Sequence, residues 1–339
     1  MNLSVRPLTP EQKEEKNYIA LDCYKLGFLL MLYQLLTYGL RYVFYLAAYW
    51  VCDGNFTLNV KTAMNYLVNN QDIVQSTAFK MSGNISITCV SLAIVMVGMH
   101  ALFNGQLGSW LRPDKKKVLT GVLWTTPDHV VNLFATMIVS YLVTILGNSG
   151  ISVPDADFTI THPSAAAIIL QAAYTILAAP IIEEILYRGM ILSVLSKYGK
   201  SPAVLLSALC FGLMHGNIPQ GVGAFISGLL YAIVAVESGS IVPSIIMHSF
   251  NNLMAEMTDI TSALGVDKDG TIVMSIIAVA GLIGFFVGCM NVNKLRFKEE
   301  QHALSIKQVR QTVFSNPMTL ICLLWYSYSI ISGLIGANS

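Results

Sequence analysis

Residues 168–195 read IILQAAYTILAAPIIEEILYRGMILSVL, and the only charged residues among them are Glu183, Glu184 and Arg188. An ionised side chain in hydrocarbon costs several kcal/mol even on mild scales, so such groups face the interior of a helix bundle and usually mark function. The segment therefore predicts a membrane-spanning helix whose charged residues point into a protected polar site.

The composition of the whole chain is typical of a membrane protein. Of its 339 residues, 54% are hydrophobic and 12% are charged, whereas soluble proteins carry about 25% charged residues. The net charge of +1 gives no indication of a nucleic-acid partner, and none is expected. The six cysteines lack the spacing of a metal site or a redox motif.

The lengths of the apolar runs predict the fold, because a membrane-spanning helix needs about 20 mostly apolar residues. We expect an all-α, polytopic transmembrane helix bundle of eight to nine spans, with a polar cavity inside the membrane. The polar stretch 52–84 should form a loop with a short surface helix. The candidate spans are 26–50, 85–103, 129–147, 165–196, 202–217, 220–237, 240–258, 272–292 and 317–336.

The basic residues of the loops predict the orientation of this integral membrane protein. With the N-terminus in the cytosol, 15 Lys and Arg residues fall in cytosolic segments and 3 fall on the opposite side. The positive-inside rule then places the C-terminus outside. The ninth span is the least constrained, because its absence would violate no loop charge. The N-terminal residues lack a signal peptide and a eukaryotic targeting signal, so we expect a prokaryotic plasma membrane.

Polar groups at membrane depth divide the chain into three parts. Residues 161–260 hold most of these groups and are expected to form the working core. Residues 1–160 and 261–339 should supply flanking transmembrane helices, with Arg41 as the charged residue inside a span of the first flank. Four histidines fall at predicted helix ends or in loops, where surface positions are expected: His100, His129, His162 and His302.

Helical geometry assigns different neighbours to the two adjacent glutamates. Glu184 and Arg188 are four residues apart and share a helix face, so they can form an ion pair. Glu183 is rotated by about 100° from Glu184 and should face a partner across the bundle. Pro180 lies one turn earlier, removes a backbone hydrogen bond and should kink the helix. A polar cluster that only locks helix packing is the alternative.

Two further helices carry polar groups that could meet these carboxylates. His215 ends the stretch FGLMH, and HSFNN contains His248 and Asn252 on one helix face. An imidazole and a carboxamide that project together can donate two hydrogen bonds to one developing oxyanion. Separate interhelical hydrogen bonds remain possible for each side chain. We expect Glu183 and these three residues to converge on one cavity, with Glu183 and His215 in hydrogen-bond reach directly or through one water.

EEILYR, FGLMH and HSFNN follow, in order and on separate predicted spans, the EExxxR, FxxxH and HxxxN/B motifs of a known family. Over residues 165–258 the chain resembles the CPBP family, also called ABI, which comprises type II CAAX prenyl endopeptidases and bacteriocin-processing or immunity proteins. The resemblance implies an intramembrane protease. It also implies that Glu183 and His215 activate water, that His248 and Asn252 stabilise the oxyanion, and that Glu184 and Arg188 order the site or contact substrate.

The resemblance leaves the cofactor and the substrate open. Proteins of this family have been classed as metalloendopeptidases, which would make Glu183, His215 and His248 zinc ligands. The chain lacks HExxH, and Asn is a poor zinc ligand, so we favour a glutamate protease that requires no cofactor. The partners implied are the lipid bilayer and a membrane-associated protein or peptide, for which a prenylated protein and a leader peptide are alternatives.

Three rival interpretations remain. Ser227 could pair with His248 as in a serine protease, although no GxSx turn surrounds Ser227. An ion-coupled transporter could use the charged and histidine side chains as a relay, but no internal repeat supports it. A membrane regulator without catalysis could retain the same motifs.

Overall fold

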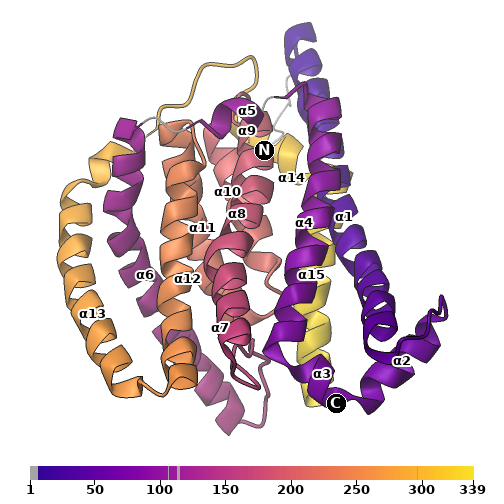
Figure 1. The fold of residues 1–339 in the computed structure, drawn as a ribbon. Helices are drawn as coiled ribbons and strands as arrows, with labels where there is room; N and C mark the ends of the chain where they lie inside the picture. The colour runs from indigo at the N-terminus through magenta and orange to yellow at the C-terminus, as the bar shows by residue number, and fades with distance from the viewer. Residues whose placement is uncertain (1–6, 106, 113–114, 296) are drawn as a thin grey trace.

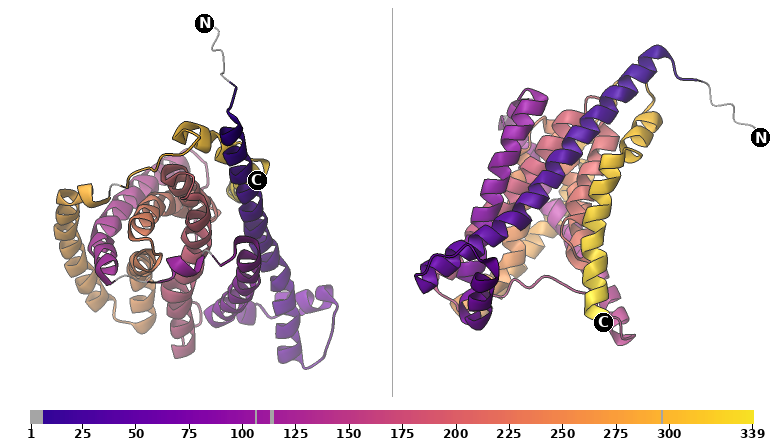
Figure 2. Two further views of the ribbon diagram at one scale, coloured as in Figure 1. Left: turned by 90° about the horizontal axis from the view of Figure 1, so that it is seen from above. Right: turned by 90° about the vertical axis from the view of Figure 1, so that its right-hand side faces the viewer.

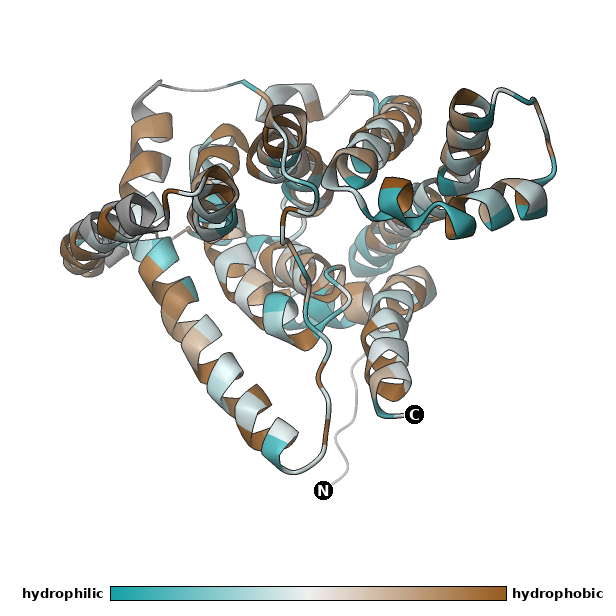
Figure 3. Ribbon diagram, turned by 60° about the horizontal axis from the view of Figure 1, so that its bottom comes forward, coloured by the Kyte–Doolittle hydropathy of each residue, from teal (hydrophilic) through white to brown (hydrophobic). Residues whose placement is uncertain are grey.

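The computed structural model describes residues 7–105, 107–112, 115–295 and 297–339, and every regular element in these ranges is helical. Long helices run between two ends of one bundle, with the start of α1 at one end and the end of α15 at the other (Figure 1). Hydrophobic residues recur along the long helices (Figure 3). The predicted all-α polytopic bundle is confirmed.

Six helices in the described part of the chain are long and apolar enough to cross a membrane. They are α1 (Pro10–Asp53), α4 (Thr77–Phe103), the apolar part of α6 (Lys115–Asn148), a composite helix over 165–195, α11 (Ile218–Ser238) and α15 (Pro317–Asn338). The other three predicted spans correspond to α10 (Lys200–Leu213), α12 (Val242–Leu264) and α13 (Asp267–Met290). The short elements are α2 (Val60–Asn69), α3 (Gln71–Gln75), α5 (Leu107–Trp110), η3 (Val292–Leu295) and α14 (Ile306–Phe314).

The helices that carry the candidate site form one group. Helix α6 packs against α11, α12 and α13, and α10 packs against α11. The view along the bundle shows this group on one side and α1 with α4 on the other (Figure 2). Helix α1 also packs against α15. The polar groups of 161–260 therefore lie on the composite helix over 165–195 and on α10–α12, with α6 packed against α11 and α12.

The span that carries Glu183 and Glu184 is not a regular α-helix. It consists of α7 (Ala165–Ala172), η1 (Ala173–Ala178), α8 (Ala179–Glu183), η2 (Glu184–Met190) and α9 (Ile191–Leu195), and both η segments are π-helical. Pro180 is the second residue after η1 and has no N–H for the α-helical ladder. The disturbance predicted at Pro180 thus takes the form of widened turns, which often occur at functional sites.

The turn between α10 and α11 lies inside the bundle. Helix α10 has 14 residues, a length of about 21 Å, whereas the hydrocarbon core is about 30 Å thick. Residues 214–217 of the turn are half-buried, and irregular backbone at membrane depth is tolerated only against protein or a polar cavity. Gly216 takes the left-handed conformation that the turn requires, with φ of 71°. The turn carries His215, one of the predicted site residues.

Candidate active site

Glu184 and Arg188 form a completely buried ion pair. Arg188 Nη1 lies 2.9 Å from Glu184 Oε1, and both side chains have 0% exposure. The pair joins positions four apart within η2, as the spacing predicts. Glu184 Oε2 and Arg188 Nε are buried without a hydrogen-bond partner among the described residues. Because removal of either partner would leave a buried charge, this pair fixes the helix in one arrangement.

Two aromatic rings and one carbonyl complete the surroundings of Arg188. Its guanidinium carbon lies 4.0 Å from the centre of the Phe211 ring and 5.2 Å from that of Tyr231. Arg188 Nη2 donates to the carbonyl of Gly228 at 3.3 Å. A Cβ at Gly228 would stand 3.1 Å from that nitrogen and 3.0 Å from Phe211. The absence of a side chain at position 228 thus permits the close approach of α11.

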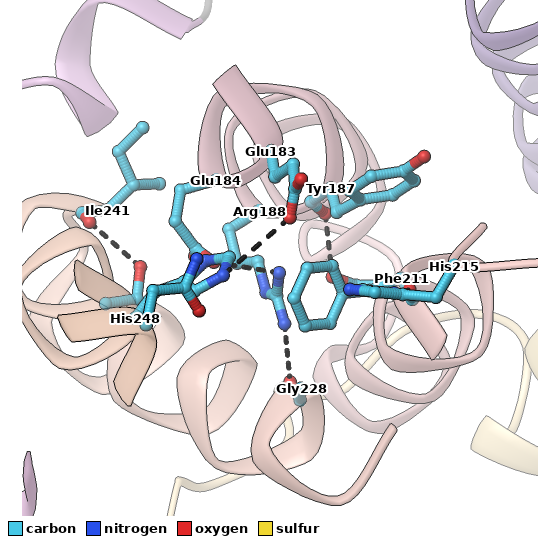
Figure 4. A network of polar contacts seen from close by, with 12 residues as sticks. Glu183, Glu184, Tyr187, Arg188, Phe211, His215, Gly228, Ile241 and His248 are labelled. Atoms are coloured by element: carbon cyan, nitrogen blue, oxygen red, sulfur yellow. Dashed lines mark hydrogen bonds and ion pairs between the residues drawn. The ribbon is translucent and has the colours of Figure 1, made fainter. Parts of the chain in front are cut away.

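His248 links the two glutamates across the bundle. Its Nδ1 lies 3.1 Å from Glu184 Oε1, and its Nε2 lies 3.7 Å from Glu183 Oε2 (Figure 4). The ring stacks on Tyr231 at 5.4 Å and meets Phe211 edge-on at 5.2 Å. Glu183 therefore has the partner across the bundle that its rotation from Glu184 predicts. His248 is held by four contacts and has one preferred orientation.

His215 presents one free ring nitrogen. Its Nδ1 lies 2.8 Å from the carbonyl oxygen of Phe211, which can only accept a hydrogen bond. The proton of the neutral ring is therefore on Nδ1, and Nε2 keeps a lone pair that can take up a proton. Phe211 also contacts the ring edge-on at 5.1 Å. A direct hydrogen bond between His215 and Glu183 is not formed in the described chain.

Asn252 is positioned by the composite helix. Its Nδ2 donates to the backbone carbonyl of Thr175 in η1 at 2.8 Å. A carboxamide nitrogen carries two protons, so this bond leaves the second N–H available to another acceptor. The π-helical winding of η1 thus has a direct consequence for the site, because it supplies the carbonyl that orients Asn252.

One cavity of about 440 Å³ lies between α6, α10, α11 and α12. Its lining includes His215, His248 and Asn252. Glu183 is not among the lining residues, but its side chain is 17% exposed and its carboxylate lies beside His248. The volume falls within the range of about 300–1,000 Å³ that is usual for ligand sites. The cavity can hold a segment of a substrate against both histidines.

Comparison with known families agrees with this geometry. Residues 165–254 match the family model described as Rce1-like, type II CAAX prenyl endopeptidase Rce1-like, and this range contains all three motifs. Residues 165–254 form a CAAX-protease-like region. Neither a curated protein nor a solved structure matches the chain. The match supports a CAAX-type intramembrane protease in general, with a membrane-associated substrate.

Two of the candidate zinc ligands, Glu183 and His248, face each other. His248 directs both ring nitrogens towards carboxylates, and its Nε2 lies 3.7 Å from Glu183 Oε2. A catalytic zinc needs three protein ligands, and among the residues that the structure describes no three His, Cys, Asp or Glu side chains are grouped so as to hold a metal ion.

Helix α6, which lies outside the CAAX-protease-like region, contributes residues that the sequence interpretation missed. His129 and Asn132 line the cavity, and His129 Nδ1 lies 2.8 Å from Asn251 Oδ1. The surface position expected for His129 is therefore wrong. Helix α6 begins at Lys115 rather than near 129, so His129 lies within the helix and not at its end.

Ser227 is held as a structural group. Its Oγ accepts a hydrogen bond from Asn132 Nδ2 at 2.7 Å, and the residue is 2% exposed. Asp128, which is 1% exposed, lies beside Ser227 and Tyr231. In the described chain His248 is bonded to carboxylates and not to Ser227. This arrangement does not favour the rival interpretation of a serine nucleophile.

Proposed function

We propose that the chain is an intramembrane endopeptidase that hydrolyses a membrane-associated protein or peptide with a water activated by Glu183 and His215. The observation that carries the proposal is the placement of Glu183 and Glu184 on the two nitrogens of His248. Such a grouping costs several kcal/mol of desolvation in a membrane bundle. Catalysis at the adjacent cavity would explain why this cost is tolerated, whereas helix packing alone would not require charged groups.

Glu183 is the group that we assign as general base. It lies beside His248, which lines the cavity, is partly exposed, and has no cationic partner as close as Arg188 is to Glu184. The carboxylate would take a proton from water while the water oxygen bonds to the scissile carbonyl carbon. His215 would accept the second hydrogen bond of that water through Nε2. General base catalysis of this kind contributes about 10²- to 10⁴-fold.

His248 and Asn252 are the groups that we assign to the oxyanion. When Nε2 of His248 carries a proton, the ring can donate there to the carbonyl oxygen, while Nδ1 donates to Glu184. The second N–H of Asn252 supplies another donor. Collapse of the intermediate breaks the C–N bond, and the proton on Glu183 passes to the leaving amine. The glutamate is thereby returned to its starting form.

The charges of the site balance when His248 is protonated. Glu183 and Glu184 then carry two negative charges, and Arg188 and His248 carry two positive charges. A buried group of zero net charge avoids the largest cost of desolvation. Glu184 and Arg188 accordingly serve as ordering residues, because their direct partners are each other, His248 and Gly228. No cofactor takes part in this scheme.

A cleavage assay with paired peptides tests the proposal. The purified chain in liposomes is mixed with a CAAX peptide, either S-farnesylated or unmodified, and with a leader-type peptide lacking the CAAX sequence. Mass spectrometry then locates any new carboxyl terminus. We expect cleavage of at least one peptide by the wild-type chain and by Ser227→Ala. Loss of cleavage in Ser227→Ala would favour the serine mechanism, and intact peptides throughout would contradict a protease of this class.

A further inference from the structure

Helix α6 turns a polar stripe towards the cavity. The stripe residues recur every three or four positions, so they share one helix face. They are His129, Asn132, Thr136 and Ser140, and all four line the cavity. The neighbouring residues Met137 and Ile138 are 60% and 61% exposed and do not line it. Helix α6 is therefore polar towards the cavity and apolar on the face that lipid can cover.

The stripe is long enough for several residues of a bound chain. Positions 129 and 140 are eleven residues apart, which corresponds to about 16 Å along the helix axis. An extended peptide rises about 3.3 Å per residue, so about five residues fit along this distance. Leu133 and Val139 line the same side of the cavity and offer apolar contact between the polar groups.

The residues that share the cavity with the stripe differ in chemistry. His215 and His248, the candidate catalytic groups, line it together with Asp155 and Phe158 of the connection between α6 and α7. A peptide that lies along α6 would therefore contact the connection as well as the histidines.

Hydrogen bonds hold the N-terminal part of the stripe, around Asn132, and leave its C-terminal part available to bind a ligand. Asn132 Nδ2 donates to Ser227 Oγ at 2.7 Å and to the Gly223 carbonyl at 3.4 Å. Thr136 Oγ1 donates to Asn132 Oδ1 at 3.2 Å and keeps its own lone pairs. Thus Asn132 anchors α6 to α11, and the hydroxyl oxygen of Thr136, which lines the cavity, can still accept a hydrogen bond.

We propose that α6 is the substrate-binding wall, on which an extended peptide segment of about five residues lies between the Asp155–Phe158 connection and His215. The hydroxyl oxygens of Thr136 and Ser140 accept hydrogen bonds from its backbone N–H groups, and Leu133 and Val139 contact its apolar side chains. The inference rests on the proposed function, since the bound segment is the substrate of the protease. It assigns substrate recognition to a helix outside the CAAX-protease-like region.

Photo-crosslinking tests the wall independently of catalysis. A benzophenone amino acid is placed at position 136 or 137 of the Glu183→Gln chain in liposomes, and a biotinylated farnesyl-CAAX decapeptide and its unmodified counterpart serve as probes. Positions 136 and 137 lie at nearly the same depth and about 100° apart around α6, and only Thr136 lines the cavity. We expect adducts at 136 that unlabelled peptide suppresses, and background at 137. Equal labelling at both positions, or no labelling at 136 with either probe, would refute the proposal that α6 is the substrate-binding wall.

Kinetics supply the second readout, with whichever probe is cleaved. Thr136→Val keeps the shape of the side chain and removes the acceptor, so KM should rise about three- to tenfold with little change in kcat, as for one lost hydrogen bond. Thr144→Val on the same helix, away from the cavity, is the matched control. Equal KM values for both variants would contradict the wall. If the chain cleaves no peptide but adducts still form at 136, peptide binding along α6 is supported and the proposed protease activity is refuted.

Discussion

Replacing Glu184 by Gln should unfold the bundle more readily than the same change at Glu183. In Glu184→Gln the guanidinium of Arg188 stays fully buried and loses the carboxylate of its ion pair, which lies 2.9 Å away. The remaining contacts of Arg188 are the Gly228 carbonyl and two aromatic faces. In Glu183→Gln the lost charge is partly exposed, and its nearest cationic partner is His248 at 3.7 Å.

The burial of the Glu184–Arg188 pair sets the expected loss of folding stability. Removal of one partner from a buried ion pair costs about 3–5 kcal/mol, because the other charge remains uncompensated. A glutamine at 184 still offers an oxygen to Arg188, so we expect the lower end, about 3 kcal/mol. For Glu183→Gln the expected loss is about 1 kcal/mol or less, as for partly exposed pairs. Both variants should lose peptide cleavage, but for different reasons.

Buried thiols provide the assay. Cys23, Cys210 and Cys322 are buried and free, so a thiol-reactive dye labels them only as the bundle opens. We expect a clearly lower labelling midpoint on heating for Glu184→Gln and a nearly unchanged one for Glu183→Gln. Glu184→Leu combined with Arg188→Met should be more stable than Glu184→Gln, since apolar replacement of both partners removes the stranded charge. Equal midpoints for Glu183→Gln and Glu184→Gln would refute the reasoning.

Three further outcomes are expected. Asn252→Ala should lower kcat about 100- to 1,000-fold, as for removal of one oxyanion donor, and unchanged kcat would exclude that role. Enzyme purified with chelator should retain full activity without stoichiometric zinc in elemental analysis, whereas loss on chelation and recovery with zinc would establish a metal mechanism. Gly121→Ala should destabilise the chain by about 1–3 kcal/mol through overpacking, because its Cβ would lie 2.9 Å from Pro243 Cα. Gly147→Ala, with no atom within 4 Å, is the matched control, and equal thermal midpoints for the two would contradict the packing of α6 on α12.

The sequence predicted the central contacts because desolvation leaves few alternatives. Charges as deep as Glu184 and Arg188 must find partners inside the bundle, and four-residue spacing provides one of them locally. Rotation along the helix then directs Glu183 towards another element, which the structure identifies as α12 with His248. The partner of Asn252 was not predictable, because the Thr175 carbonyl becomes available only through the π-helical winding of η1.

The contribution of α6 to the cavity was not predicted, although its apolar part was expected as a span at 129–147. The helix begins earlier, at Lys115, where charged and polar residues interrupt the apolar run that defines a span. The spacing of Asn132, Thr136 and Ser140 was the available signal, since a polar stripe in an apolar run indicates a helix facing a cavity. The early start of α1 at Pro10 was missed for a similar reason, although Thr9 and Gln12 form a capping box there.

Turnover by Glu183→Gln tests the central claim most directly. Initial rates of peptide cleavage are measured for the wild-type and variant chains in liposomes at equal protein content, with the thiol-labelling midpoint as the control for folding. If Glu183 takes the proton from the attacking water, the variant rate falls by about 100-fold or more, while the midpoint stays close to that of the wild type. A folded Glu183→Gln chain that cleaves the peptide at the wild-type rate would contradict the account.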